Sequence, residues 1–179
     1  MSVLRALVLV WLAGVAPALA AGPTEYQVKA VFLFNFAQFV VWPPQALGAA
    51  DAPFSICIVG EDPFGAELDV TVRGENVQGH PFAVRRYRDP GDIESACHIV
   101  FIGASQLTQL EKIVKSLGDR AILTVSDIDH SAERGTMIQF ASEHNRLRLR
   151  INIAAAKAAG LTISSKLLRP SQIIGPEAG

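Results

Sequence analysis

The chain has 179 residues, of which 50% are hydrophobic, and its 16 lysines and arginines nearly balance its 17 aspartates and glutamates. This length fits one domain with a substantial core. A formal net charge of −1 provides no global positive field to attract nucleic acid, so we expect no nucleic-acid partner.

The first twenty residues have the pattern of a cleavable signal peptide. Arg5 is the only charged side chain of this segment, an apolar run from Ala6 to Val15 follows, and Ala18-Leu19-Ala20 has the A-x-A form of a cleavage site. The apolar run is too short for a membrane-spanning helix, which needs about 20 residues. We therefore expect export, removal of residues 1–20, and one mature domain over residues 21–179 without a membrane span.

A long helix is predicted at the start of the mature chain. Thr24 and Gln27 have the spacing of a capping box, and Pro43-Pro44 ends the segment, so the helix is expected from Glu25 to Val41. The helix is apolar around most of its circumference, which is typical of a helix covered on two sides. Either the rest of the domain covers it, or part of it forms a dimer or partner interface. The candidate interface residues on this helix are Phe32, Phe34, Phe36, Phe39 and Val41.

Short apolar strands alternate with helices through the middle of the chain. The predicted strands are Ser55–Val59, Pro81–Tyr87, His98–Ile102 and Ala121–Val125. The predicted helical segments are a helix that Asp62 caps and Pro63 begins, a short turn from Asp89 or Gly91 to Ala96, and a helix from Ser105 to Leu117. Apolar strands that alternate with helices indicate an α/β sandwich with a mainly parallel central sheet.

The pattern then changes to a C-terminal antiparallel hairpin. Met137–Ala141 and Arg146–Ile153 flank a polar turn. An alanine-rich helix over Ala154–Ala159 and a last strand or extended segment over Leu161–Leu168 follow, and the tail after Pro170 is predicted to be a loop. We expect roughly seven strands in all.

Arginines occupy one face of the second hairpin strand. Arg146, Arg148 and Arg150 alternate with leucine and isoleucine, and the pleat of a strand places alternate side chains on one face. This pattern fits a solvated face whose charge prevents edge pairing. It also fits a docking surface for the carboxylates of a sensor domain or for lipid phosphates.

Cys57 and Cys97 each lie in a predicted apolar strand. An even number of cysteines in an exported protein favours a disulfide. A free thiol in such a strand instead behaves as a small hydrophobic side chain. The residues alone leave both interpretations open.

No motif in the chain carries catalytic or metal-binding chemistry. Gly60 to Gly65 has the glycine spacing of a phosphate-binding loop, but Ala66-Glu67 stands where that loop requires Lys followed by Ser or Thr. The four histidines lack ligand spacing, and His98 is expected as a satisfied core residue. Ser126-Asp127 fits a helix cap or turn better than half of a nucleophilic site. We expect no catalytic residue, metal or cofactor.

A small-ligand crevice is the main alternative source of function. In open α/β sheets, ligands bind outside the carboxyl ends of the strands at a switch point. None of the residues at the predicted strand ends specifies a ligand, so the alternative is a ligand-binding sensor that acts on a membrane partner. The candidate crevice residues are Gly60, Glu61, Ser105, Ser126 and Asp127.

An ordered set of segments carries a family resemblance. Val28–Pro43 is the first, and similar segments follow in order at Ile56–Gly60, Asp62–Gly65, Cys97–Ile102, Leu123–Asp127, Gly135, Met137–Ile138, Asn145, Ile151–Asn152 and Gly160–Leu168. Each segment alone is a weak signal, but the ordered set covers the mature chain and is specific. Together, the segments resemble the YfiR family of periplasmic proteins.

The resemblance implies a regulator rather than an enzyme. Members of this family are periplasmic repressors of an inner-membrane diguanylate cyclase, whose periplasmic sensor domain they bind, so that cyclic-di-GMP output and biofilm formation fall. The resemblance also implies an α/β sandwich, a homodimer and redox input through cysteines. Cys57 and Cys97 match the strand cysteines of the family, which favours their disulfide. Some relatives have a second pair near Gly135, which this chain lacks, so a two-disulfide switch is not expected.

Overall fold

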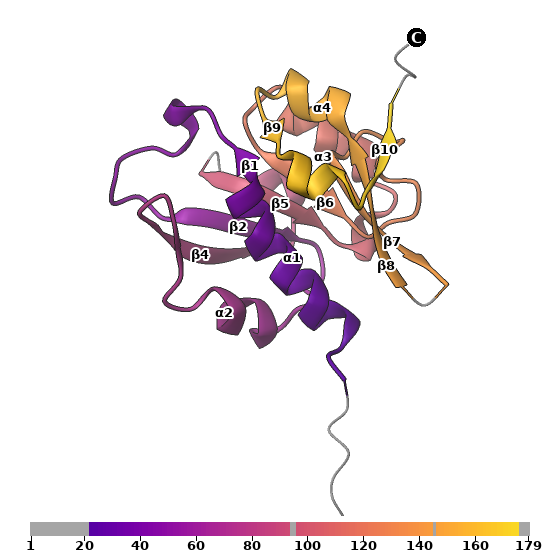
Figure 1. Ribbon diagram of the computed structural model, residues 1–179, viewed down its shortest axis with the longest axis horizontal. Coiled ribbons are helices and arrows are strands. Elements are labelled where there is room, and N and C mark those ends of the chain that lie inside the picture. Colours follow the sequence, from indigo (N-terminus) through magenta and orange to yellow (C-terminus); the bar gives the residue numbers. More distant parts are fainter. Residues whose placement is uncertain (1–21, 94–95, 145, 176–179) are drawn as a thin grey trace, which may run out of the picture.

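The computed structural model describes residues 22–93, 96–144 and 146–175, and it confirms the predicted α/β sandwich (Figure 1). The predicted signal peptide, residues 1–20, lies outside the described residues. The main sheet contains β2 (Phe54–Val59), β3 (Asn76–Val77), β4 (His80–Tyr87), β5 (Cys97–Ile102), β6 (Leu123–Ser126), β7 (Ile138–Glu143), β8 (Arg146–Asn152) and β10 (Gln172–Ile174).

The eight strands lie in the order β10-β8-β7-β6-β5-β2-β4-β3. The five strands from β4 to β7 are mutually parallel along this order, and β7 and β8 form the predicted antiparallel hairpin. A separate two-stranded sheet pairs β1 (Val40–Val41) with β9 (Thr162–Ile163). The described residues thus form ten strands, more than the roughly seven expected, because several pairings involve only two or three residues.

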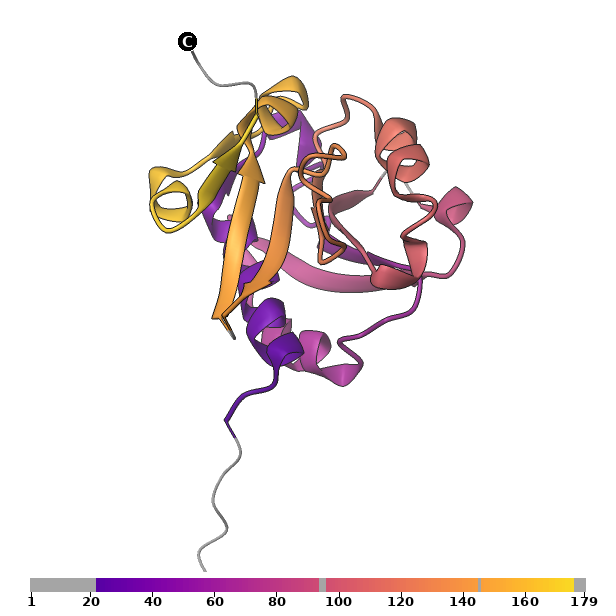
Figure 2. The same cartoon turned by 90° about the vertical axis from the view of Figure 1, so that its right-hand side faces the viewer.

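Helices cover both faces of the main sheet (Figure 2). The α-helices are α1 (Glu25–Phe39), α2 (Ala66–Val72), α3 (Leu110–Leu117), α4 (Ile153–Ala158) and α5 (Ser165–Leu168). The 3-10 turns are η1 (Pro44–Ala46), η2 (Pro90–Asp92) and η3 (Ala104–Gln106). The core against α1 also includes side chains of α2, α4 and α5, whereas the core of the opposite face includes those of α3. No described helix has the length and apolarity that crossing a bilayer requires.

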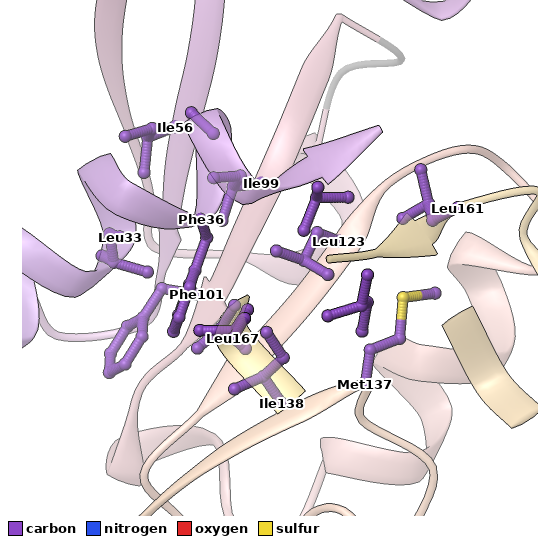
Figure 3. Packing of buried hydrophobic residues seen from close by; sticks show 14 of the residues in the cluster. Leu33, Phe36, Ile56, Ile99, Phe101, Leu123, Met137, Ile138, Leu161 and Leu167 are labelled. Atoms are coloured by element: carbon purple, nitrogen blue, oxygen red, sulfur yellow. The ribbon is translucent and has the colours of Figure 1, made fainter. Parts of the chain in front are cut away.

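Successive side chains of the central strands point alternately to the two faces of the sheet and so contribute to both cores. In β2, Ile56 and Ile58 belong to the core under α1, whereas Cys57 and Val59 belong to the core under α3. All six residues of β2 are buried, as expected for a parallel strand with helices on both sides. Figure 3 shows Phe36 extending from α1 into the first core.

Helix α1 begins as predicted but ends two residues early. Thr24 accepts a hydrogen bond from the Gln27 N–H, and the Gln27 side chain accepts one from the Thr24 N–H, so the capping box is present. The predicted end at Val41 is wrong, because Val40 and Val41 leave the helix and pair with β9. Branched side chains favour this extended conformation, and the partner strand lies more than a hundred residues away in the sequence.

Other predicted boundaries shift for local reasons. The helix expected at Pro63 begins at Ala66, because Asp62 accepts the Phe64 N–H in a turn and Gly65 has a φ of +53°. The helix expected from Ser105 begins at Leu110, after η3. The turn expected up to Ala96 is η2, which ends at Asp92; residues 94–95 lie outside the described residues.

The C-terminal segment differs most from prediction. The expected strand Leu161–Leu168 divides into β9 and α5, because the Ser164 side chain accepts the Lys166 N–H and caps a helical turn. The tail after Pro170 is not only a loop, because β10 adds to β8 in parallel. Both differences depend on contacts with distant strands, which local sequence does not specify.

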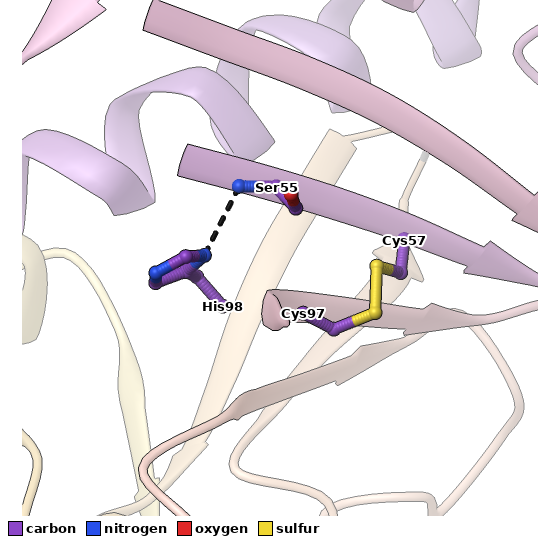
Figure 4. The surroundings of a disulfide bond; sticks show 4 residues. All are labelled: Ser55, Cys57, Cys97 and His98. Carbon is purple, nitrogen blue, oxygen red and sulfur yellow. Dashed lines mark hydrogen bonds between the residues drawn. A yellow bond between two sulfur atoms is a disulfide. The ribbon is translucent and has the colours of Figure 1, made fainter. Parts of the chain in front are cut away.

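A β-bulge in β5 brings Cys97 into position for a disulfide with Cys57. Ser55 pairs with Cys97 but the next residue, Ile56, pairs with Ile99, so His98 is an extra residue in the ladder. The His98 Nδ1 accepts the Ser55 N–H at 3.0 Å (Figure 4). The bulge turns Cys97 toward the α3 face, where it is bonded to Cys57 with the Cα atoms 5.9 Å apart. The expected Cys57–Cys97 disulfide is therefore present in the structure.

Replacing Cys57 and Cys97 together by alanine is expected to lower the free energy of unfolding by about 4 kcal/mol. The bridge closes a loop with a sequence separation of 40, and this closure restricts the unfolded chain. Denaturation in urea measures the loss. A reductant should destabilise the wild type and leave the double variant unchanged; equal stability of the two proteins would contradict the prediction.

Candidate functional site

The carboxyl ends of β2, β4 and β5 meet at one end of the sheet. Gly60 follows β2 and donates its N–H to the Tyr87 carbonyl at 2.9 Å, and Gly103 follows β5 and donates to the Val59 carbonyl at 3.0 Å. The chain runs from β2 to β4 on one side and returns to β5 on the other, so this is the switch point of the sheet. A ligand crevice is expected at such a point.

A groove of about 870 Å³ lies at this end of the sheet. The Ser105 hydroxyl accepts the Glu61 N–H at 2.9 Å, which ties the two loops together. A side chain at Gly60 would collide with Ser105, because a Cβ there would lie 2.3 Å from the hydroxyl oxygen. The structure therefore brings Gly60, Glu61 and Ser105 together. The groove is lined by Gly60, Glu61, Asp62, Arg86, Tyr87, Arg88, Ser105 and Gln106.

The two arginines of this groove differ in their partners. Arg86 donates to Asp62 at 2.6 Å and also contacts the Asp69 carboxylate. The hydrogen bond to Asp69 raises the pKa of Arg86 further above its usual value, although burial lowers it. The Arg86 guanidinium is therefore already paired with Asp62 and Asp69. Arg88 is exposed and makes no ion pair with another described residue. Its charge is available to an anionic group in the groove.

The other two crevice candidates are directed into the protein. The buried Ser126 hydroxyl donates to the Ile102 carbonyl at 2.8 Å and accepts the Ile128 N–H at 3.1 Å. The Asp127 carboxylate accepts hydrogen bonds from Lys29 Nζ at 2.8 Å and from the Tyr26 hydroxyl at 2.9 Å. Ser126 therefore forms the turn after β6, and Asp127 holds α1.

This buried ion pair was missed by the sequence reasoning. The side chains of Lys29 and Asp127 are only 3% and 7% exposed. Burial lowers the pKa of Lys29, but hydrogen bonds to Asp127 and Glu25 outweigh it, so the net pKa is raised. The pKa of Tyr26 is raised by burial and by Asp127. One lysine in an otherwise apolar helix was the available signal, but nothing local identified its partner.

The aromatic candidates of α1 are largely used inside the domain. Phe36 is fully buried and its ring centroid lies 5.8 Å from that of Phe140. Phe32 also contacts Phe140, and Phe34 lies 5.5 Å from Phe82. The sheet therefore covers much of the apolar surface of this helix.

The end of α1 is more accessible. The half-buried Phe39 ring lies 6.0 Å from Lys166 Nζ. Val41 of β1 is 60% exposed. Of the five hydrophobic candidates, Val41 is the one that presents most of its side chain to the surface.

The arginines of β8 alternate with buried residues as the sequence indicated. Leu149 and Ile151 are buried, whereas Arg146 and Arg148 are exposed. Arg150 donates to Glu143 at 2.9 Å and lies 3.6 Å from Glu133. Arg146 and Arg148 have no carboxylate partner among the described residues. The free positive charge of this face thus lies toward the hairpin turn.

The buried histidines have structural partners. His98 accepts a backbone N–H in the bulge, and burial lowers its pKa. His80 Nδ1 lies 2.8 Å from the Ala52 carbonyl oxygen. Across residues 22–93, 96–144 and 146–175, no three His, Cys, Asp or Glu side chains are placed to hold a metal ion.

A family model described as YfiR/HmsC-like matches residues 26–172, which is most of the chain. The chain belongs to the YfiR/HmsC-like family. The match includes the crevice, both cysteines, the Lys29–Asp127 pair and the arginines of β8. No curated protein matches the chain.

This YfiR/HmsC-like chain is also similar to a solved structure. A conserved domain protein from Vibrio cholerae O1 biovar eltor superposes with a TM-score of 0.52 at 13% sequence identity. The match covers 83% of this chain and 60% of that one, so this chain spans less than two thirds of that protein. At this identity, the likeness shows the fold alone.

Substituting Lys29 by methionine is expected to destabilise this YfiR/HmsC-like domain by about 3–5 kcal/mol, because Asp127 would remain buried without a counter-charge. A second substitution, Asp127→Asn, should recover part of the loss. The raised pKa of Lys29 means that the wild type keeps its advantage below pH 10.5, the ordinary lysine value, and loses it as the pH rises further.

Urea denaturation of the wild type and the variants, repeated across pH, measures both effects. The exposed Lys112→Met is the matched control and should change stability by less than about 0.5 kcal/mol. A Lys29→Met protein as stable as this control would refute the role of the ion pair.

Proposed function

We propose that the chain is a periplasmic regulatory protein that binds and represses the periplasmic sensor domain of an inner-membrane diguanylate cyclase. Repression lowers cyclic-di-GMP output and biofilm formation. The observation that carries this proposal is the family match over residues 26–172. The export pattern of residues 1–20 supports a periplasmic location, with residues 21–179 acting as one domain.

The proposal assigns no catalytic residue, metal or cofactor to the chain. Two polar residues at the end of β6 are consistent with this, because the Ser126 hydroxyl is bonded to the Ile102 carbonyl and the Asp127 carboxylate to Lys29. The Cys57–Cys97 disulfide provides a place for redox input, since it joins the two central strands.

We also propose that the protein acts as a homodimer. The exposed Val41 lies in β1, beside the exposed Thr162 of β9. An apolar side chain on this small sheet is suited to contact a second copy, because interface cores are enriched in such groups. The buried Phe36 belongs to the monomer core and has no part in this contact.

Deleting the gene in its native host is expected to raise the cellular concentration of cyclic-di-GMP, because the cyclase would lose its repressor. Mass spectrometry of cell extracts measures the nucleotide. The full chain expressed from a plasmid should restore the low concentration, whereas a matched chain without residues 2–20 should not, because it stays in the cytoplasm. An unchanged nucleotide concentration after deletion would contradict the proposed function.

The groove at the switch point supports a second candidate function, a small-ligand sensor acting on another membrane partner. Its volume of about 870 Å³ is sufficient for a small molecule, and Arg88 and Gln106 offer polar contacts. Native mass spectrometry of protein purified from the periplasm tests this candidate. A bound small molecule that is lost in the variant Arg88→Glu, which reverses the available positive charge of the groove, is the expected result; a ligand-free protein would contradict it.

A further inference from the structure

The outer edge of β8 is only partly covered. On one side, β8 pairs with β7 from Arg146 to Ile151. On the other side, β10 pairs only with Arg150, Ile151 and Asn152. The stretch 146–149 therefore has no strand on its outer side within the described part of the chain. Figure 1 shows the hairpin of β7 and β8 projecting beyond the start of β10.

This open stretch presents backbone groups that can pair with a strand. Successive residues of a strand direct their N–H and C=O groups alternately to the two sides. The pairing of β8 with β10 begins at Arg150, so Arg146, Leu147 and Arg148 have no strand partner on the outer side among the described residues. Such an edge is a template for an added strand from another chain.

A groove lies beside this edge where the chain enters β10. Its volume is about 310 Å³. The turn that forms one wall is held in place, because Ser171 donates its N–H to the Leu168 carbonyl at 3.0 Å and its hydroxyl to the Leu167 carbonyl at 2.6 Å. The lining residues are Glu143, Arg148, Leu149, Arg169, Pro170, Ser171 and Gln172.

The charge that remains free in this groove is positive. Arg148 and Arg169 are exposed and have no carboxylate partner within residues 22–93, 96–144 and 146–175. The one carboxylate of the groove, Glu143, is bound by Arg150 at 2.9 Å. Two free guanidinium groups favour carboxylates, which arginine binds through paired hydrogen bonds.

We propose that an extended acidic segment of a partner protein binds here as an added strand, paired with residues 146–149 of β8 and contacting Arg148 and Arg169 through its carboxylates. The segment would continue the line of β10 along the same edge. The backbone pairing provides affinity, and the two arginines select for acidic side chains. The proposal rests on the proposed function only for the identity of the protein that carries the segment.

A fluorescein-labelled ten-residue peptide of alternating valine and glutamate tests this site by fluorescence anisotropy with the full mature chain. We expect the wild type to bind it and the double variant Arg148→Glu/Arg169→Glu to bind at least about tenfold more weakly, because two attractions become repulsions. Arg73→Glu, at an exposed arginine after α2, is the matched control and should bind as the wild type does. Circular dichroism of each variant verifies the fold.

Two further peptides separate strand addition from simple charge attraction. Replacing glutamate by lysine should abolish binding, and methylating alternate backbone nitrogens of the original peptide should weaken it at least about tenfold, because the ladder hydrogen bonds are lost. Equal binding of the methylated peptide, or equal binding by the double variant, would overturn the proposal. So would a wild-type dimer that the double variant breaks, because the edge would then bind a second copy of this chain.

The peptide experiment is independent of the cyclase. If the peptide binds as expected in a protein that does not change cyclic-di-GMP, the docking site stands and the proposed function fails. If the peptide does not bind to a protein that represses the cyclase, the docking site is overturned and the proposed function stands.

Discussion

The pairing of β2 with β5 is the constraint on which the rest of this structure depends. Every residue of both strands is buried, so their side chains build a core on each face of the sheet. The bulge at His98 lets Cys97 reach Cys57 across this pair of strands. The His98 ring accepts a hydrogen bond from the Ser55 N–H at the point where the ladder is irregular. The carboxyl ends of the same two strands bring Gly60 and Gly103 together at the switch point.

Much of the fold was predictable because its signals are local. Apolar strands that alternate with helices predicted the α/β sandwich, the capping box at Thr24 predicted the start of α1, and the arginine alternation predicted the exposed face of β8. These features depend on residues within one or two turns of each other. Sequence patterns describe such interactions well.

The parts that sequence reasoning missed depend on distant partners. Val40 and Val41 could extend a helix by pattern, but their pairing with Thr162 and Ile163 decides their conformation. The strand β10 is three residues long and exists only because β8 is there to pair with it. The extra residue at His98 is likewise invisible until the register between two strands is known.

The candidate crevice was predicted only in part, because the directions of two of its side chains also depend on distant partners. Gly60, Glu61 and Ser105 come together because they follow strands that are neighbours in the sheet. Ser126 and Asp127 also follow a strand, but their side chains are directed to a buried carbonyl and a buried lysine. A position at a strand end therefore indicates where a side chain lies, but the tertiary contacts decide whether it faces solvent.

We propose that the chain regulates a membrane protein by binding it through the edge of β8. Hydrogen–deuterium exchange of the full mature chain, with and without the purified periplasmic sensor domain of the cyclase, tests this claim most directly. We expect slower exchange of the outward-facing backbone amides of Leu147 and Leu149 in the complex, with little change at the opposite sheet edge in β3. Unchanged exchange at Leu147 and Leu149 in a complex that does form would contradict the claim.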